Sequence, residues 1–211
     1  EQVTTRLRHY VSNEAERLAF AQALGIDPES LVSLTSQEAE AILTWLNSRS
    51  LHFGQSAYIA LETLLGDAGI SYSRTELATR LILTDILTGT LTPLETEDLV
   101  ISIYAMRRVA ASYTLQARGY KMTFHAMKAM YEEACRLEPE ACDFRFTILI
   151  DGDHYVMVTG IKQMVKTDGG GTVLLDQNGS PILDDYVTFI DPSAGPEGAL
   201  DLITVSKEEF L

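Results

Sequence analysis

The sequence predicts an α+β protein in which a helical layer precedes an antiparallel sheet. Apolar residues recur at helical spacing through much of the chain up to residue 137. Beyond Pro139 the pattern changes to short β-branched and aromatic runs between turn residues, notably at 144–150 and 154–161. Helices first and strands afterwards is typical of α+β proteins, because a parallel sheet would show strands and helices in alternation.

Two helices are expected in the first fifty residues, at 12–24 and 36–48. The second has a capping box, in which Thr35 precedes Glu38 by three positions. We interpret residues 1–50 as an N-terminal helical extension packed on a main domain of residues 51–211.

The next helix, at 54–66, is the element around which the rest is organised. Gly54 opens it after a polar loop, and apolar residues then recur at spacings of three and four. A helix N-terminus presents unpaired N–H groups and partial positive charge, which lower a thiol pKa and stabilise an oxyanion. The position before Gly54 therefore suits a nucleophile.

Further helices are expected at 73–81, where Ser73 with Glu76 predicts the cap, at 92–111 and at 124–137. Residues 113–120 show a weak strand pattern.

The strands follow at 144–150, 154–161 and 186–190. Asn178-Gly179 predicts a hairpin turn between short strands at 172–175 and 181–183. Ser206 with Glu209 predicts the cap of a last helix. No internal repeat is expected.

Composition limits the possible partners. The chain has 211 residues and a formal net charge of −14, which argues against nucleic acid or an anionic membrane as partner. Its apolar runs are shorter than the roughly 20 residues that span a bilayer, so we expect no membrane insertion. The chain shows no leader pattern, and a cytoplasmic location is favoured. The oligomeric state is left open.

The two cysteines, Cys135 and Cys142, lie seven positions apart. Two free thiols are the expectation, and a local disulfide is the alternative. Because further cysteines and nearby histidines are missing, we expect neither a metal nor another cofactor.

Two polar residues stand where expected strands begin and end. His154 opens a strand, and Asp191 closes a neighbouring one just before Pro192. If these strands pair, the carboxylate could orient an imidazole that faces the helix start at Gly54. This is the arrangement of base and orienting group around a nucleophile, although His154 could equally be an ordinary strand-end histidine and Asp191 a turn initiator.

These blocks resemble the double-glycine, bacteriocin-processing peptidases, a family of papain-like cysteine peptidases. The family pattern is Cys-Gly-Pro before a helix, a strand beginning His-(Tyr/Phe)-Val-Val-Val-x-Gly, and a strand ending Asp-Pro. The corresponding segments here are Phe53-Gly54-Gln55-Ser56-Ala57, His154-Tyr155-Val156-Met157-Val158-Thr159-Gly160 and Asp191-Pro192. The resemblance covers residues 50–211 and implies a papain-like fold.

The departures from the family pattern decide the expected function. The family nucleophile falls on Phe53, which carries no thiol, and the oxyanion-stabilising glutamine falls on Asn47, a shorter donor. We therefore expect a catalytically degenerate domain that binds a peptide or protein segment near Gly54, Gln55 and Ser56. The alternatives are a hydrolase that uses Ser56 as its nucleophile and a purely structural module.

Overall fold

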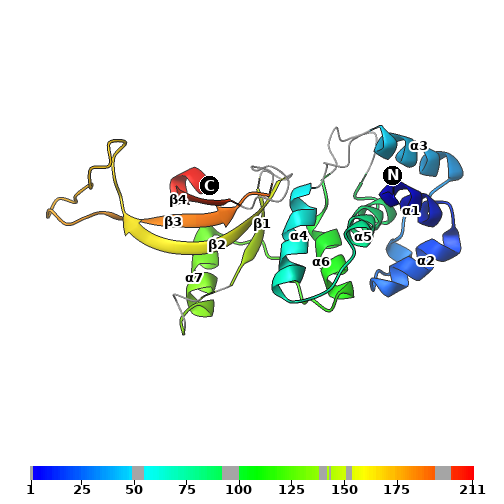
Figure 1. The fold of residues 1–211 in the computed structure, drawn as a ribbon, viewed down its shortest axis with the longest axis horizontal. Helices are drawn as coiled ribbons and strands as arrows, with labels where there is room; N and C mark the ends of the chain where they lie inside the picture. Colours follow the sequence, from blue (N-terminus) through cyan, green and yellow to red (C-terminus); the bar gives the residue numbers. More distant parts are fainter. Residues whose placement is uncertain are drawn as a thin grey trace. The chain divides into compact units, whose positions relative to one another are not determined.

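The computed structural model describes residues 2–48, 55–91, 100–137, 142, 144–150, 154–192 and 201–211 (Figure 1). The chain divides into two compact units, which we name by their content. The helical unit comprises residues 1–120 with 151–154, and the sheet unit comprises residues 121–150 with 155–211. Helices and an antiparallel sheet together confirm the predicted α+β class.

The helical unit contains α1 to α6. Their bounds are α1 Gln2–Val11, α2 Glu14–Ala23, the short 3-10 helix η1 Pro28–Ser30, α3 Ser36–Asn47, α4 Gln55–Asp67, α5 Arg74–Leu87 and α6 Ile103–Ser112. Helix α1 was not predicted from the sequence. It packs on α2, α3 and α5, so the helices of residues 1–50 lie in the same compact unit as α4 and α6.

Side-chain caps begin α2 and α3 of the helical unit. The side chain of Asn13, a cap that was not predicted, accepts from the N–H groups of Ala15 and Glu16 at the start of α2. Thr35 and Glu38 form the expected reciprocal capping box at the start of α3. These bonds satisfy N–H groups that the helix cannot pair internally.

Helix α5 is longer than predicted. It begins after the expected cap Ser73 but continues to Leu87 rather than ending at Leu81. Its second half is buried on all sides, so it lacks the single apolar stripe that marks a surface helix. The buried hydroxyls of Thr79 and Thr84 donate to carbonyl oxygens one turn earlier, at 2.6 and 2.7 Å. These bonds allow two polar residues inside the core.

The prediction of one helix over 92–111 is wrong for the part that the structure describes. Residues 100–102 are not helical, and α6 begins at Ile103 with Ser102 as its N-cap. Residues 92–99 lie outside the described residues. Ser102 is held by the buried carboxylate of Asp85, which accepts from the backbone N–H of Ser102 at 2.7 Å and from its hydroxyl at 2.5 Å. This long-range contact fixes where α6 begins.

The weak strand expected at 113–120 does not form. Residues 113–114 make a turn, with Thr114 at a φ of +63°, and residues 115–120 have no regular structure. The N–H of Leu115 donates to the carbonyl of Ala110, which closes the end of α6. The N–H groups of Tyr113 and Thr114 likewise donate to carbonyls at the end of α6 rather than to a neighbouring strand.

The sheet unit is built around four strands in the order β1-β2-β3-β4. They are β1 Phe146–Ile150, β2 His154–Val165, β3 Leu183–Ile190 and β4 Leu202–Ser206, and the pairs β2–β3 and β3–β4 are antiparallel. The first three confirm the predicted strands, and β4 was not predicted. Helix α7, Phe124–Ala134, ends three residues before the predicted residue 137, and α8, Lys207–Phe210, follows the expected capping box of Ser206 and Glu209.

A core cluster joins α7 to the sheet. Its buried members are Met127 of α7, Val158 and Ile161 of β2, and Val187 of β3. The β2–β3 register shifts between Val158 and Gly160. A Cβ at Gly160 would lie 3.4 Å from the Cβ of Thr188 and 4.0 Å from the hydroxyl of Tyr131, which is ordinary van der Waals contact.

A tandem repeat of eight residues connects β2 to β3, contrary to the expectation of no repeat. Its copies are residues 168–175 and 176–183, and we call this connection the arm. In each copy the first aspartate accepts backbone N–H groups from the residues two and four positions later, at 2.8–2.9 Å. Gly171 and Gly179 adopt the same left-handed φ, +81° and +79°. The aspartate and the glycine at matching positions therefore give the two copies the same turn geometry.

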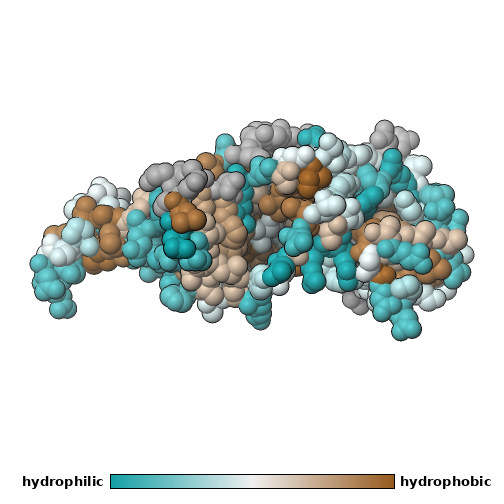
Figure 2. Space-filling model, turned by 90° about the horizontal axis from the view of Figure 1, so that it is seen from below, coloured by the Kyte–Doolittle hydropathy of each residue, from teal (hydrophilic) through white to brown (hydrophobic). Residues whose placement is uncertain are grey.

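The hairpin turn predicted at Asn178-Gly179 forms, but residues 172–175 make only isolated bridges, Thr167 with Val173 and Leu175 with Pro181. The arm exposes apolar side chains, which Figure 2 shows in brown beside its hydrophilic end. The exposed large ones are Val173, Leu175, Ile182 and Leu183.

The expectation of two free thiols is wrong, and the local alternative is correct. Cys135 and Cys142 form a disulfide, with their Cα atoms 5.1 Å apart. Cys135 is the C-cap of α7, and Cys142 lies four residues before the start of β1. The Cα distance falls within the range of natural disulfides.

Among the described residues, helices long and apolar enough to cross a bilayer do not occur. Nor do three or more metal-ligating side chains gather at one place in that part of the chain.

Candidate functional site

The predicted nucleophile region lies between α3 and α4. Asn47 is the last residue of α3 and is exposed, and α4 begins at Gln55, one residue after the predicted start. Phe53 and Gly54, together with the side chain of Gln55, lie outside the described residues. Ser56 is buried in the first turn of α4. The helix N-terminus required by the hypothesis is therefore present at the expected place in the chain.

The predicted base and its orienting carboxylate lie at a common edge of the sheet. His154 is the first residue of β2, and Asp191 directly follows β3. The register pairs Met157 with Ile190, so β2 begins and β3 ends at the same edge. Both side chains are half-buried. The hydrogen bond expected between them stays a prediction.

His154 also marks the point where the chain passes from one unit to the other. It is grouped with the helical unit, whereas the rest of β2 belongs to the sheet unit.

Sequence reasoning missed a polar cluster on α4. Glu62 accepts hydrogen bonds from the hydroxyl of Tyr72 at 2.8 Å and from Nε of Arg74 at 2.7 Å. Burial, and then the charge of Glu62, raises the pKa of Tyr58 to about 12. Tyr58 therefore keeps its proton at neutral pH. Separations of ten and twelve residues along the chain carry no sequence signal, so the cluster could not be predicted.

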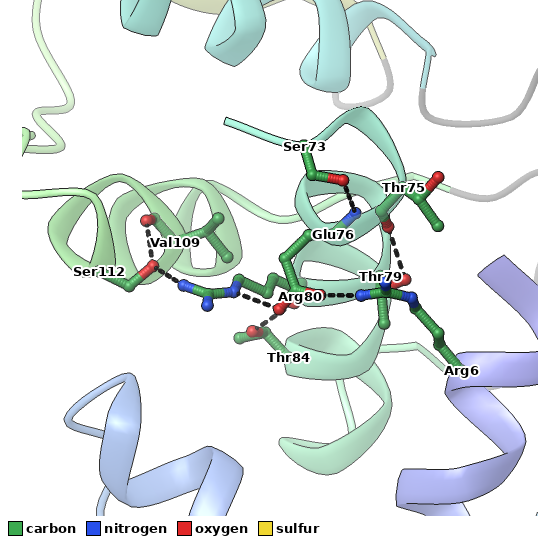
Figure 3. Close-up of polar contacts among 9 residues, drawn as sticks. All are labelled: Arg6, Ser73, Thr75, Glu76, Thr79, Arg80, Thr84, Val109 and Ser112. Carbon is green, nitrogen blue, oxygen red and sulfur yellow. Dashed lines mark hydrogen bonds and ion pairs between the residues drawn. The ribbon is translucent and has the colours of Figure 1, made fainter. Parts of the chain in front are cut away.

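A second network joins α1, α5 and α6 (Figure 3). Glu76 of α5 pairs with Arg6 of α1 and, at 2.9 Å, with Nε of Arg80. Arg80 also donates to the hydroxyl of Ser112 at 2.8 Å and lies 5.0 Å from the ring centroid of Tyr113. These contacts bind helices of the expected N-terminal extension to the rest of the helical unit, and their role is structural.

Asp85 is the most unusual titratable group among the described residues. Its side chain is fully buried in α5. Burial raises its pKa to about 6, although the two hydrogen bonds from Ser102 favour the ionised form. Both oxygens of the carboxylate thus accept hydrogen bonds from Ser102, the N-cap of α6. This carboxylate is a structural group that titrates close to neutral pH.

Comparison of the chain with family models, with curated proteins and with solved structures gives no match.

Proposed function

We propose that this chain is a papain-like domain with a degenerate catalytic site, which binds a peptide or protein segment without cleaving it. In this proposal the main domain spans residues 51–211, and the helices of residues 1–50 extend it. His154 and Asp191 are the remnant catalytic pair, Phe53 stands at the nucleophile position, and Asn47 stands at the oxyanion position.

One observation carries the proposal: β2 begins at His154 and β3 ends just before Asp191, at the same edge of an antiparallel sheet. A second observation supports it, since α4 begins at Gln55, directly after the Phe53-Gly54 pair. The order helix, histidine strand, aspartate strand is that of the family pattern. The side chain at position 53 then determines whether such a site cleaves a peptide or only binds it.

A phenyl ring at position 53 favours binding over cleavage. It supplies neither a thiolate nor a hydroxyl, and loss of the nucleophile removes most of the rate enhancement of such a site. The ring instead offers an apolar surface on which a ligand side chain could pack. The amide of Asn47 keeps a hydrogen-bond donor for a peptide carbonyl.

The alternative of a hydrolase that uses Ser56 is less well supported. Ser56 is 8% exposed and lies within the first turn of α4. A nucleophile must reach a carbonyl carbon in the cleft, and a side chain packed within the helical layer is poorly placed for such an attack.

Photo-crosslinking tests the proposed binding site. Phe53 is replaced by p-benzoylphenylalanine, which keeps the ring, and the full chain is irradiated with a random decapeptide library. We expect peptide adducts at position 53 well above those of a control with the same group at Leu18, an exposed position of α2. Equal labelling at the two positions would favour the structural-module alternative.

A cleavage assay tests the absence of catalysis. The unmodified protein is incubated with the same library, and products are sought by mass spectrometry. We expect none. Cleavage that Ser56→Ala abolishes would establish the hydrolase alternative instead.

A further inference from the structure

The disulfide joins two segments that pack on one core. Cys135 caps the last turn of α7 and is buried, and its N–H donates to the carbonyl of Tyr131 at 2.9 Å. Cys142 precedes β1, which begins at Phe146. Both Tyr131 and Phe146 pack against the core cluster of the sheet unit. The cystine therefore links the C-terminal end of α7 to the residues that precede β1, and both elements pack against the same core cluster.

The geometry of the two cysteines fits a cystine. Cys135 is 6% exposed, so its sulfur is shielded from reductants in solution. The Cα atoms lie 5.1 Å apart, within the range of natural disulfides. The closed ring runs from residue 135 to residue 142, so the bond constrains a short, local connection.

We propose that this protein works in an oxidising compartment, where Cys135 and Cys142 are joined into a structural cystine that holds α7 to the sheet. This inference does not rest on the proposed function. It replaces the reducing, cytoplasmic location that the sequence favoured, because structural disulfides form and persist in oxidising compartments and are rare in the reducing cytosol.

The oxidant required is a disulfide, either small or carried by an exchange protein. The thiolate of one cysteine attacks a sulfur of that disulfide and forms a mixed disulfide, releasing the first thiol. The second cysteine then attacks the sulfur of its partner cysteine and releases the second thiol. The two electrons and two protons lost by the cysteines end on the two thiols of the reduced oxidant.

The first test traps thiols in the cells that make the protein. Membrane-permeable N-ethylmaleimide is added before lysis, and the labels on the full chain are counted by mass spectrometry after denaturation. We expect neither cysteine to be labelled. Labelling of both would place the chain in a reducing compartment and overturn the proposal.

The second test asks whether the bond supports the fold. The purified chain is oxidised with glutathione disulfide and then melted with and without a phosphine reductant. Reduction should lower the melting temperature by about 5 °C, the low end expected for a short ring in a chain of this size. Equal melting temperatures for the two forms would show that the cystine does not hold the fold.

The variant carrying Cys135→Ala and Cys142→Ala provides the matched control. It should melt near the reduced protein and should not respond to the reductant. A response in this variant would show that the reductant acts elsewhere, and the shift seen with the natural chain would then count against the proposal.

Discussion

The helical unit and the sheet unit differ in how their cores are built and reinforced. Helix α5 runs through the core of the helical unit and buries residues on all its sides, including Leu83 and Asp85. In the sheet unit one core cluster has four buried members surrounded by partly buried apolar side chains, and further buried residues lie on β2 and β3, among them Met157 and Ile190. Around that cluster stand the cystine and the ion pair of Lys128 with Asp185.

This difference indicates which kinds of change should destabilise each unit. Burial of apolar surface does not depend on a disulfide, so the helical unit should respond most to changes in its packing and in the buried carboxylate of Asp85, and should not respond to a reductant. The sheet unit adds a cystine and a largely buried ion pair to its apolar contacts. The sheet unit should therefore respond to changes in those contacts.

The largest effect is expected from Leu83→Ala in α5. Leu83 is fully buried, and its truncation should lower the free energy of unfolding by about 3 kcal/mol, because transfer and cavity costs add. The single tryptophan, Trp45, lies in α3, so its fluorescence in urea reports on the helical unit.

Leu18→Ala in α2 is the matched control, since Leu18 is exposed and its loss should cost less than about 0.5 kcal/mol. Equal losses for the two variants would contradict the picture of a core centred on α5.

The next effect comes from the charge of Asp85. Its folded pKa of about 6 lies above the ordinary value of 3.8, so the folded state binds the proton more tightly than the unfolded state. The free energy of unfolding should therefore fall as pH rises from 4 to above 6, by on the order of 2–3 kcal/mol. Urea titrations at several pH values measure this dependence.

Asp85→Asn should abolish that part of the pH dependence while keeping an acceptor for the N–H of Ser102. The exposed Asp201, changed to Asn, should leave it intact. A pH profile that survives Asp85→Asn would show that another group causes it.

A smaller effect is expected from the ion pair in the sheet unit. Nζ of Lys128 lies 2.5 Å from the carboxylate of Asp185, and this hydrogen bond raises the pKa of Lys128. Both side chains are largely buried, so Lys128→Met should cost about 1 kcal/mol. Hydrogen exchange of the β3 amides provides the measurement.

Arg136→Met removes a comparable but exposed pair with Glu133 and should have little effect. If the two changes were equivalent, the sheet unit would not depend on its partly buried charges.

The smallest effect is expected in the arm. Gly179 has a φ of +79°, where an alanine is strained, so Gly179→Ala should cost roughly 0.5–1 kcal/mol of local stability. Gly169 lies in the same arm in open space and without that backbone constraint, and Gly169→Ala is the control. Hydrogen exchange at Ser180, whose N–H bonds to Asp176, should quicken in the first variant only.

Local chemistry explains what the sequence could predict. The caps at Thr35, Ser73 and Ser206 act over three residues, and the helices they begin start where expected. The strands β1 to β3 carry β-branched and aromatic runs with clear turn residues between them. Interactions of this range are visible in sequence.

Contacts between distant residues explain the errors. The start of α6 depends on a hydrogen bond between Ser102 and Asp85, seventeen residues apart, which no local pattern reveals. Helix α5 was predicted too short because burial on all sides removes its periodicity. Of the candidate site, the positions of His154 and Asp191 at one sheet edge followed from the order of the strands, whereas the cluster around Glu62 depends on tertiary packing.

The proposal of a degenerate peptidase site is tested most directly by restoring its missing thiol. The two natural cysteines are joined to each other, so an introduced cysteine is the only thiol available to iodoacetamide. Phe53→Cys is compared at neutral pH with the same variant carrying His154→Ala, and with a cysteine placed at the exposed Asp201.

If the N-terminus of α4 and His154 both stabilise a thiolate at position 53, the pKa of the thiol in Phe53→Cys should lie below the ~8.5 of a free cysteine. It should therefore be alkylated faster than the cysteine at position 201, and His154→Ala should remove the advantage. Alkylation of all three variants at the same rate would contradict the proposal.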